Sequence, residues 1–239
     1  MNIDDLLKQN TEADRNSNGV NLQKENSIGQ NLSRLNLSGA DLRGKDLSKT
    51  NLSEANLSGA NLTGANLTQA NLSRANMSQA ILTEATLTKA NLTEVNLSKA
   101  NLIKANFSGV NLSRAKLWLA LLSEASLRQV NLSEANLIEV NLINANLSMA
   151  NLNRANLRMA SLVGADLTGA NLNEANLSDA KLTGANLRIA NLSGAELSRA
   201  ILTGANLSRA ILSRASLYAV DLADVKLTGA MMPDGTVHL

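Results

Sequence analysis

The chain contains no cysteine among its 239 residues, and only one histidine, one proline and three aromatic residues. Without cysteine it has no disulfide framework and no thiolate metal site. The single histidine, His238, is the next-to-last residue, which argues against Ser-His-Asp or Cys-His catalysis and against the usual histidine-based metal sites. We therefore expect no enzyme, no catalytic residue, no metal and no cofactor.

The chain also lacks long apolar runs and a dominant charge. No apolar stretch approaches the roughly 18 residues of a membrane-spanning helix, and no basic region followed by an apolar run marks a secretory signal. Lys and Arg number 22 and Asp and Glu 20, for a formal net charge of +2. This small excess gives nucleic-acid binding little support. We expect a cytoplasmic protein that does not contact a membrane.

A unit of five residues dominates the sequence: Ala, Asn, Leu, then Ser or Thr, then a variable residue. Every fifth residue from Leu32 to Leu227 is Leu, except Met77 and Phe107, and we call this residue the centre of its unit. Helices repeat their faces near 3.6 residues and strands at 2, so neither element alone has this period. Leu and Ala, two residues apart, point the same way in a short extended segment. The Asn and the hydroxyl residue suit a bend, because both hydrogen-bond neighbouring backbone.

Extended segments joined by bends at a fixed short period predict a solenoid, in which each coil stacks on the previous one. The unit A-[N/D]-L-[S/T]-X resembles that of the pentapeptide-repeat proteins, over nearly the whole chain. This resemblance implies an all-β fold, a right-handed quadrilateral parallel β-helix with four units per coil. It also implies that the centre and the residue two before it point inward. Residues twenty apart then stack in columns, with coils ~4.8 Å apart.

The repeat divides the chain into three segments. Residues 1–14 break the pattern, and an apolar stripe behind the potential N-cap Asn2 predicts a short capping helix and lead-in. Residues 15–232 carry the units, in about eleven coils of which the first is degraded. A Pro-Asp-Gly turn signal follows Met232, so we expect residues 233–239 to form a C-terminal cap or tail.

Folding the sequence at twenty residues per coil predicts two regular columns. The first is a structural ladder of carboxamides that hydrogen-bond from coil to coil, as in cross-β stacks: Asn31, Asn51, Asn71, Asn91, Asn111, Asn131, Asn151, Asn171 and Asn191. The second alternates in sign, so that every neighbour attracts and a slip by one coil brings like charges together: Arg34, Glu54, Arg74, Glu94, Arg114, Glu134, Arg154 and Glu174.

Apolar residues interrupt the polar coat in the middle coils. The candidate partner surface comprises Trp118, Leu119 and Leu121, Ile138 one coil from the Trp, Ile103, Ile143 and Val163 on the adjoining face, and Met159, with Met149 also expected nearby. Trp is the residue most enriched at interface hot spots, and scattered apolar residues do not usually gather in this way. The alternative is that these outward side chains merely cover one another.

Three classes of function compete. The resemblance is strongest to cyanobacterial cytoplasmic members of the family, such as a heterocyst-differentiation regulator. It implies a non-enzymatic interaction scaffold that acts on another protein of unknown identity, as a monomer or weak dimer. The alternative is a DNA mimic that binds a topoisomerase such as DNA gyrase, as the family's fluoroquinolone-resistance members do. That role implies an acidic rod with aromatic centres, whereas this chain is nearly neutral with Leu centres. Ice or mineral binding by stacked Ser and Thr is a third hypothesis, weakened by the flanking charges.

Overall fold

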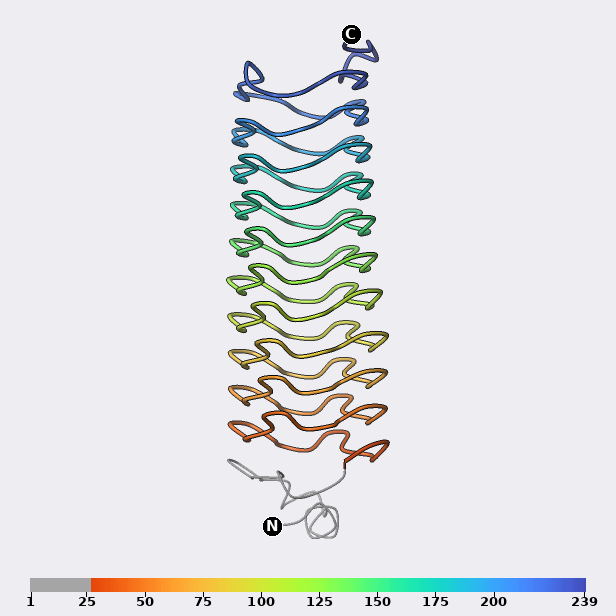
Figure 1. Cartoon of the computed structure of the whole chain (residues 1–239), viewed down its shortest axis with the longest axis vertical. Helices are drawn as coiled ribbons and strands as arrows, with labels where there is room; N and C mark the ends of the chain where they lie inside the picture. The colour runs from red at the N-terminus through yellow and green to blue at the C-terminus, as the bar shows by residue number, and fades with distance from the viewer. Residues whose placement is uncertain (1–26) are drawn as a thin grey trace.

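The computed structural model describes residues 27–239, so the expected capping helix and lead-in of residues 1–14 lie outside the described part. Residues 27–239 contain no helix, and their extended segments pair through single residues. Parallel β-bridges recur every five residues, and each joins a residue to the one twenty positions later, from Asn31 and Asn51 to Ile211 and Met231. The chain is therefore a four-sided β-solenoid, whose coils stack along one long axis (Figure 1). Ten steps at ~4.8 Å give a rod of roughly 48 Å.

Each five-residue unit makes one side and one corner of the coil. In the unit centred on Leu132, the N–H of Ala135 donates to the Leu132 carbonyl at 3.1 Å and closes a turn through Ser133 and Glu134. Glu134 has φ +58°, and a positive φ at the third residue is what a type II turn requires. The backbone of Asn131 lies in the extended side and bridges to the coils before and after it, while its Oδ1 accepts the N–H of Ser133 at 3.2 Å and so stabilises the bend, as expected.

Three backbone hydrogen bonds per unit hold a coil to its neighbours. The N–H groups of Leu132 and Glu134 donate to carbonyls of the following coil at 2.7 and 2.9 Å. The N–H of Asn131 donates to the Val110 carbonyl of the preceding coil at 2.9 Å. This pattern recurs along most of the rod, so the backbone polar groups are satisfied without any long strand.

The core is a thin aliphatic column along the axis. Centres from Leu32 to Leu212 are at most 1% exposed, including the exceptional Met77 and Phe107. The Ala residues two positions before the centres are buried beside them. Each Leu removed from water contributes roughly 1.5–3 kcal/mol before the entropy of ordering the chain is counted. The all-β solenoid with inward Leu and Ala is thus confirmed, whereas right-handed winding stays a prediction.

The C-terminal coil is less regular than the coils before it. Its centres Leu217 and Leu222 are only partly buried, and their N–H groups donate no backbone hydrogen bond. After the turn at residues 233–235 the chain folds back, and Met231 and Val237 form an antiparallel bridge. Residues 233–239 therefore cover one edge of the last coil and leave its remaining edges open.

Candidate interaction surface

Three exposed apolar residues lie close together on the outside of one coil. Trp118 and Leu119 form a corner, and Leu121 lies on the side that follows it. Their exposed fractions are 38%, 39% and 40%. Leu119 adopts φ +57° as other corner residues do, so its side chain replaces a residue that is glycine or charged in most other coils. The polar coat of the rod is interrupted at this corner.

The Trp118 indole is held against the preceding coil. The Lys99 ammonium nitrogen lies 4.8 Å from the centroid of the ring, within the range of a cation–π interaction. Ser98, which occupies the Trp118 position one coil earlier, is 6% exposed, whereas Ser78 in the same column is half-buried. The indole therefore covers Ser98. Lys99 was not among the predicted surface residues. It precedes Trp118 by nineteen positions, which is one residue less than a coil, and this spacing indicates the contact.

The corner residues of the following coils extend the apolar area. The N–H of Leu119 donates to the carbonyl of Ile138 at 3.1 Å, and the Ile138 side chain is half-buried. Met159 is 48% exposed and stands two coils beyond Leu119 in the same column, with Glu139 between them. The structure thus brings Ile138 directly beside the Trp118 corner, whereas Met159 lies at its margin.

The other predicted residues line the next corner of the rod. Ile103, Ile143 and Val163 stand in one column and are half-buried. Leu121 lies on the side between this corner and the Trp118 corner, so the apolar residues cover one side and both of its edges. Ser123 interrupts the column. We define the Trp118 surface as Trp118, Leu119, Leu121, Ile103, Ile138, Ile143, Val163 and Met159.

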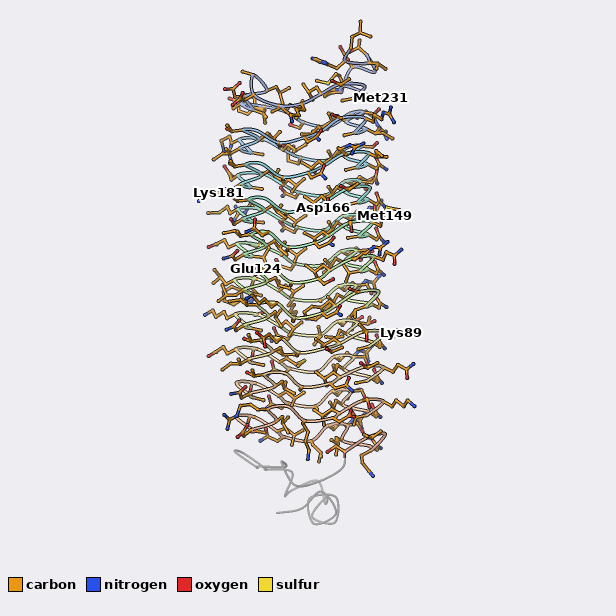
Figure 2. All side chains as sticks on the ribbon, viewed as in Figure 1. Lys89, Glu124, Met149, Asp166, Lys181 and Met231 are labelled. Atoms are coloured by element: carbon orange, nitrogen blue, oxygen red, sulfur yellow. The ribbon has the colours of Figure 1, made fainter. Side chains whose placement is uncertain are left out.

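Met149 does not belong to the Trp118 surface. It is 59% exposed, but it occupies the corner diagonally opposite Trp118, because six units and therefore one and a half coils separate the two positions. Its side chain lies over the next coil, where its sulfur would be 2.6 Å from a Cβ added to Gly169. Figure 2 shows Met149 along one edge of the rod and Glu124 on the other side. The expectation that Met149 lies near Trp118 is therefore wrong.

The predicted Asn column carries coil-to-coil hydrogen bonds between carboxamides. Nδ2 donates to Oδ1 of the Asn one coil earlier at 3.1–3.3 Å from Asn51, Asn71, Asn91, Asn131, Asn151 and Asn171. Asn111 departs from the pattern, because its Nδ2 donates to the Thr93 hydroxyl at 3.0 Å. A second, shorter ladder, which we did not predict, runs through Asn36, Asn56, Asn76 and Asn96.

The predicted charge column forms four separate ion pairs. Nε of each Arg lies 2.7–3.1 Å from Oε2 of the Glu one coil later, in Arg34–Glu54, Arg74–Glu94, Arg114–Glu134 and Arg154–Glu174. No ion pair joins a Glu to the Arg that follows it in this described column. Hydrogen bonding and charge from Arg154 lower the pKa of Glu174 below its ordinary 4.5. The column is thus a row of paired charges on the surface, since its side chains remain largely exposed.

Carboxylic acids elsewhere on the rod are held in their charged form. A hydrogen bond from the Ser198 hydroxyl lowers the pKa of Glu196, and one from the Arg199 guanidinium lowers the pKa of Asp179. A general acid working near neutral pH needs a raised pKa instead. Over residues 27–239, no three His, Cys, Asp or Glu side chains gather as a metal site would require. The described part of the chain holds no helix with the length and apolarity that crossing a membrane requires.

Fold and surface together define a β-solenoid repeat protein, built from five-residue units around a Leu column. The profile of one known family, "Pentapeptide repeats (8 copies)", matches residues 18–48, 31–69, 46–79, 80–118, 120–158, 150–188 and 190–229. The chain therefore belongs to the pentapeptide-repeat proteins. No curated protein matches it.

Several solved structures are similar to this chain. HetL, described as a pentapeptide repeat protein involved in heterocyst differentiation regulation in the cyanobacterium Nostoc sp. strain PCC 7120, is 34% identical over 100% of both chains, with a TM-score of 0.50. Rfr23 from the cyanobacterium Cyanothece 51142 is 26% identical over 74% of this chain and 93% of its own, with a TM-score of 0.22. QnrB1, a plasmid-mediated fluoroquinolone resistance protein, is 19% identical over 90% and 92%, with a TM-score of 0.43.

Proposed function

We propose that this chain is a non-enzymatic interaction scaffold, a cytoplasmic regulator that acts by contact with another protein through the Trp118 surface. The observation that carries the proposal is the exposed corner of Trp118 and Leu119 with Leu121 beside it, three large apolar residues gathered on the outside of one coil. Buried aromatic anchors surrounded by weaker contacts supply most of the free energy of protein association. The full-length similarity to HetL, whose description names a regulator, supports the same role.

The rigidity of the rod suits this role. Each residue of the surface belongs to a five-residue unit whose centre is at most 1% exposed and whose backbone hydrogen-bonds to two neighbouring coils. A partner therefore meets a pre-formed surface, and little conformational entropy is lost when it binds. The indole lies against the rod through Lys99, so a partner would bind one face and the edge of the ring.

Affinity capture from a cyanobacterial lysate tests the proposal. We expect the wild-type chain to capture a reproducible partner and Trp118→Ala to lose it at least tenfold. Tyr218→Ala is the matched control, because Tyr218 is an exposed aromatic residue outside the Trp118 surface. Sedimentation of both variants covers the case in which the partner is a second copy of the chain. A Trp118→Ala variant that keeps every partner and the wild-type oligomeric state would overturn the proposal.

The charge of the rod disfavours the alternative of a DNA mimic. Residues 27–239 carry nineteen Lys and Arg and fifteen Asp and Glu, so the described rod is cationic. A surface that imitates DNA needs a dense row of negative charge. In a DNA gyrase supercoiling assay with ciprofloxacin, we expect the chain to give no protection. Protection by the wild-type chain would favour the alternative.

A further inference from the structure

The corner diagonally opposite Trp118 carries cations and no acids. Each coil contributes two residues to this corner, the hydroxyl position and the variable position. These positions hold Ser, Thr, Gln or Gly, three aliphatic residues and five cations. The aliphatic residues are Ile28, Met149 and Ile189, and the cations are Lys49, Lys89, Arg128, Arg188 and Arg209. We call this row of residues the cationic corner. Figure 2 shows Lys89 and Met149 along this edge, with Glu124 and Lys181 on the other side of the rod.

The cations of this corner are exposed and make no ion pair. All five residues are exposed, and none takes part in the ion pairs of the described chain. The other three corners mix charges of both signs, and six of the seven ion pairs join residues at those corners across adjacent coils. The cationic corner thus keeps its donors and its charge available to a ligand.

The entire charge excess of the described rod is located here. Residues 27–239 carry four more cations than acids. The cationic corner contributes five positive charges, so the rest of the described rod sums to one negative charge. The side that follows the corner is the Asn column, which is neutral from Asn31 to Met231. A row of one sign on an otherwise balanced rod concentrates positive potential along one edge.

Two acids on the preceding side are already engaged in the backbone turns. Oδ1 of Asp46 accepts hydrogen bonds from the Ser48 N–H at 3.0 Å and from Asn66 Nδ2 at 3.1 Å. Oδ1 of Asp166 accepts from the Thr168 N–H at 3.0 Å and from Asn186 Nδ2 at 3.3 Å. These carboxylates replace Asn in the same turn geometry and do not pair with the corner cations.

Aliphatic residues alternate with the cations in the second half of the corner. Met149 is 59% exposed and Ile189 is 54% exposed, and they stand two coils apart between Arg128 and Arg209. Surfaces that bind single-stranded nucleic acid interleave cations with aromatic rings on which bases stack. The cationic corner holds no aromatic residue. Exposed Met and Ile fit instead the aliphatic side chains of a polypeptide.

We propose that the cationic corner is a second protein-binding surface, whose partner is an acidic segment with interspersed aliphatic residues. The segment lies parallel to the rod, pairs its carboxylates with Lys49, Lys89 and Arg128, and packs its aliphatic side chains on Met149 and Ile189. Because this corner is diagonally opposite the Trp118 surface, both partners bind at once without contact between them. This inference does not depend on the function proposed for the Trp118 surface.

The spacing of the cations fits an α-helical segment. Lys49, Lys89 and Arg128 follow one another at intervals of two coils, roughly 9.6 Å at the spacing of adjacent strands. A helix advances roughly 10.5 Å in seven residues. Glutamates seven residues apart on one face of a helix therefore meet successive cations of the corner.

Binding of a designed peptide tests the inference. The probe is a fluorescent 24-residue helical peptide with Glu at seven-residue spacing and Leu on the same face, and its binding is followed by fluorescence anisotropy at 150 mM salt. We expect Lys49→Glu combined with Lys89→Glu and Arg128→Glu to weaken binding at least tenfold. The matched control changes Lys116→Glu, Arg158→Glu and Lys181→Glu, three exposed cations elsewhere with the same total charge change, and we expect less than a threefold effect.

Additional measurements distinguish specific binding of the peptide from loss of folding and from binding of nucleic acid. Replacing Leu by Ser in the peptide should weaken binding to the wild-type chain, and Trp118→Ala should leave it unchanged. Circular dichroism confirms that each triple variant is folded, and the milder triple change of the corner cations to Gln repeats the test if the Glu variant is not. The inference is wrong if the wild-type chain does not bind the peptide, if both triple variants lose binding equally, or if the corner variants lose affinity for duplex DNA or single-stranded RNA but not for the peptide.

Discussion

At the scale of single residues, the corners hold side chains in a backbone conformation that L-amino acids rarely adopt. From Arg34 to Ala219, residues other than glycine at the variable position have φ between +54° and +60°. This left-handed region costs an L-residue roughly 1–2 kcal/mol. The hydrogen bonds between coils hold each corner in place, because the N–H of the variable residue donates to the next coil.

Replacing a corner residue by glycine should remove the free-energy cost of the left-handed backbone conformation. Gln129 is a suitable position, because it is exposed and has φ +56°. Gln129→Gly should raise the free energy of unfolding by about 0.5–1 kcal/mol, since the relieved backbone cost exceeds the added entropy of the unfolded chain. Gln129→Ala keeps the Cβ and should give no such gain. Denaturant unfolding of the three proteins measures the difference, and equal stability of the Gly and Ala variants would contradict the explanation.

At the scale of the structural element, side chains reinforce the coil-to-coil contacts of the backbone. The carboxamide of a column Asn does two things at once. In Asn131, Oδ1 accepts the N–H of Ser133 at 3.2 Å and Nδ2 of Asn151 at 3.1 Å, while Nδ2 donates to Asn111 at 3.2 Å. One side chain thus fixes the bend of its own coil and the spacing to two others.

A comparison of Asn131 with Asn191 tests how much the hydrogen bonds between Asn residues of the column add to the stability given by the turn. Asn191 makes the turn bonds to Ser193 but no ladder bond to another Asn of its column. Asn131→Ala removes three side-chain hydrogen bonds and Asn191→Ala removes two, so Asn131→Ala should destabilise the protein by about 0.5–1.5 kcal/mol more than Asn191→Ala. Denaturant unfolding measures both variants. Equal losses would mean that the ladder adds nothing to the bond within the turn.

The five-residue period predicted the grid and the core, because inward direction follows from residue spacing alone. The period could not predict toward which neighbouring coil a long side chain extends. The alternating charge column was therefore expected to be continuous, whereas Arg34 and its equivalents form ion pairs only with the following coil. The contact of Lys99 with Trp118 and the place of Met149 at the diagonally opposite corner, by contrast, follow from the twenty-residue spacing and could have been predicted. The fold-back of Val237 onto Met231 depends on pairing outside the repeat.

At the scale of the whole molecule, the solenoid converts a one-dimensional spacing into separate surfaces. Residues of the Trp118 surface lie up to sixty positions apart in sequence and yet cover adjoining coils. Residues close in sequence can belong to different parts of the surface of the rod, since Trp118 lies at a corner and Lys116 on the side before it. The cationic corner is distributed over 160 positions in the same way. Each surface depends on residues twenty apart being neighbours.

Engineered disulfides measure that neighbour relation directly, because the chain has no cysteine of its own. Ser53 and Ser73 are twenty apart in one corner column, with coils ~4.8 Å apart, and disulfides span Cα atoms about 4.4–6.8 Å apart. Ser53→Cys with Ser73→Cys should therefore oxidise to an intramolecular disulfide, detected by mass spectrometry without reductant. Ser53→Cys with Thr63→Cys, ten apart and at opposite corners, should keep two free thiols. A disulfide in the second protein and free thiols in the first would contradict the four-sided solenoid and both surfaces derived from it.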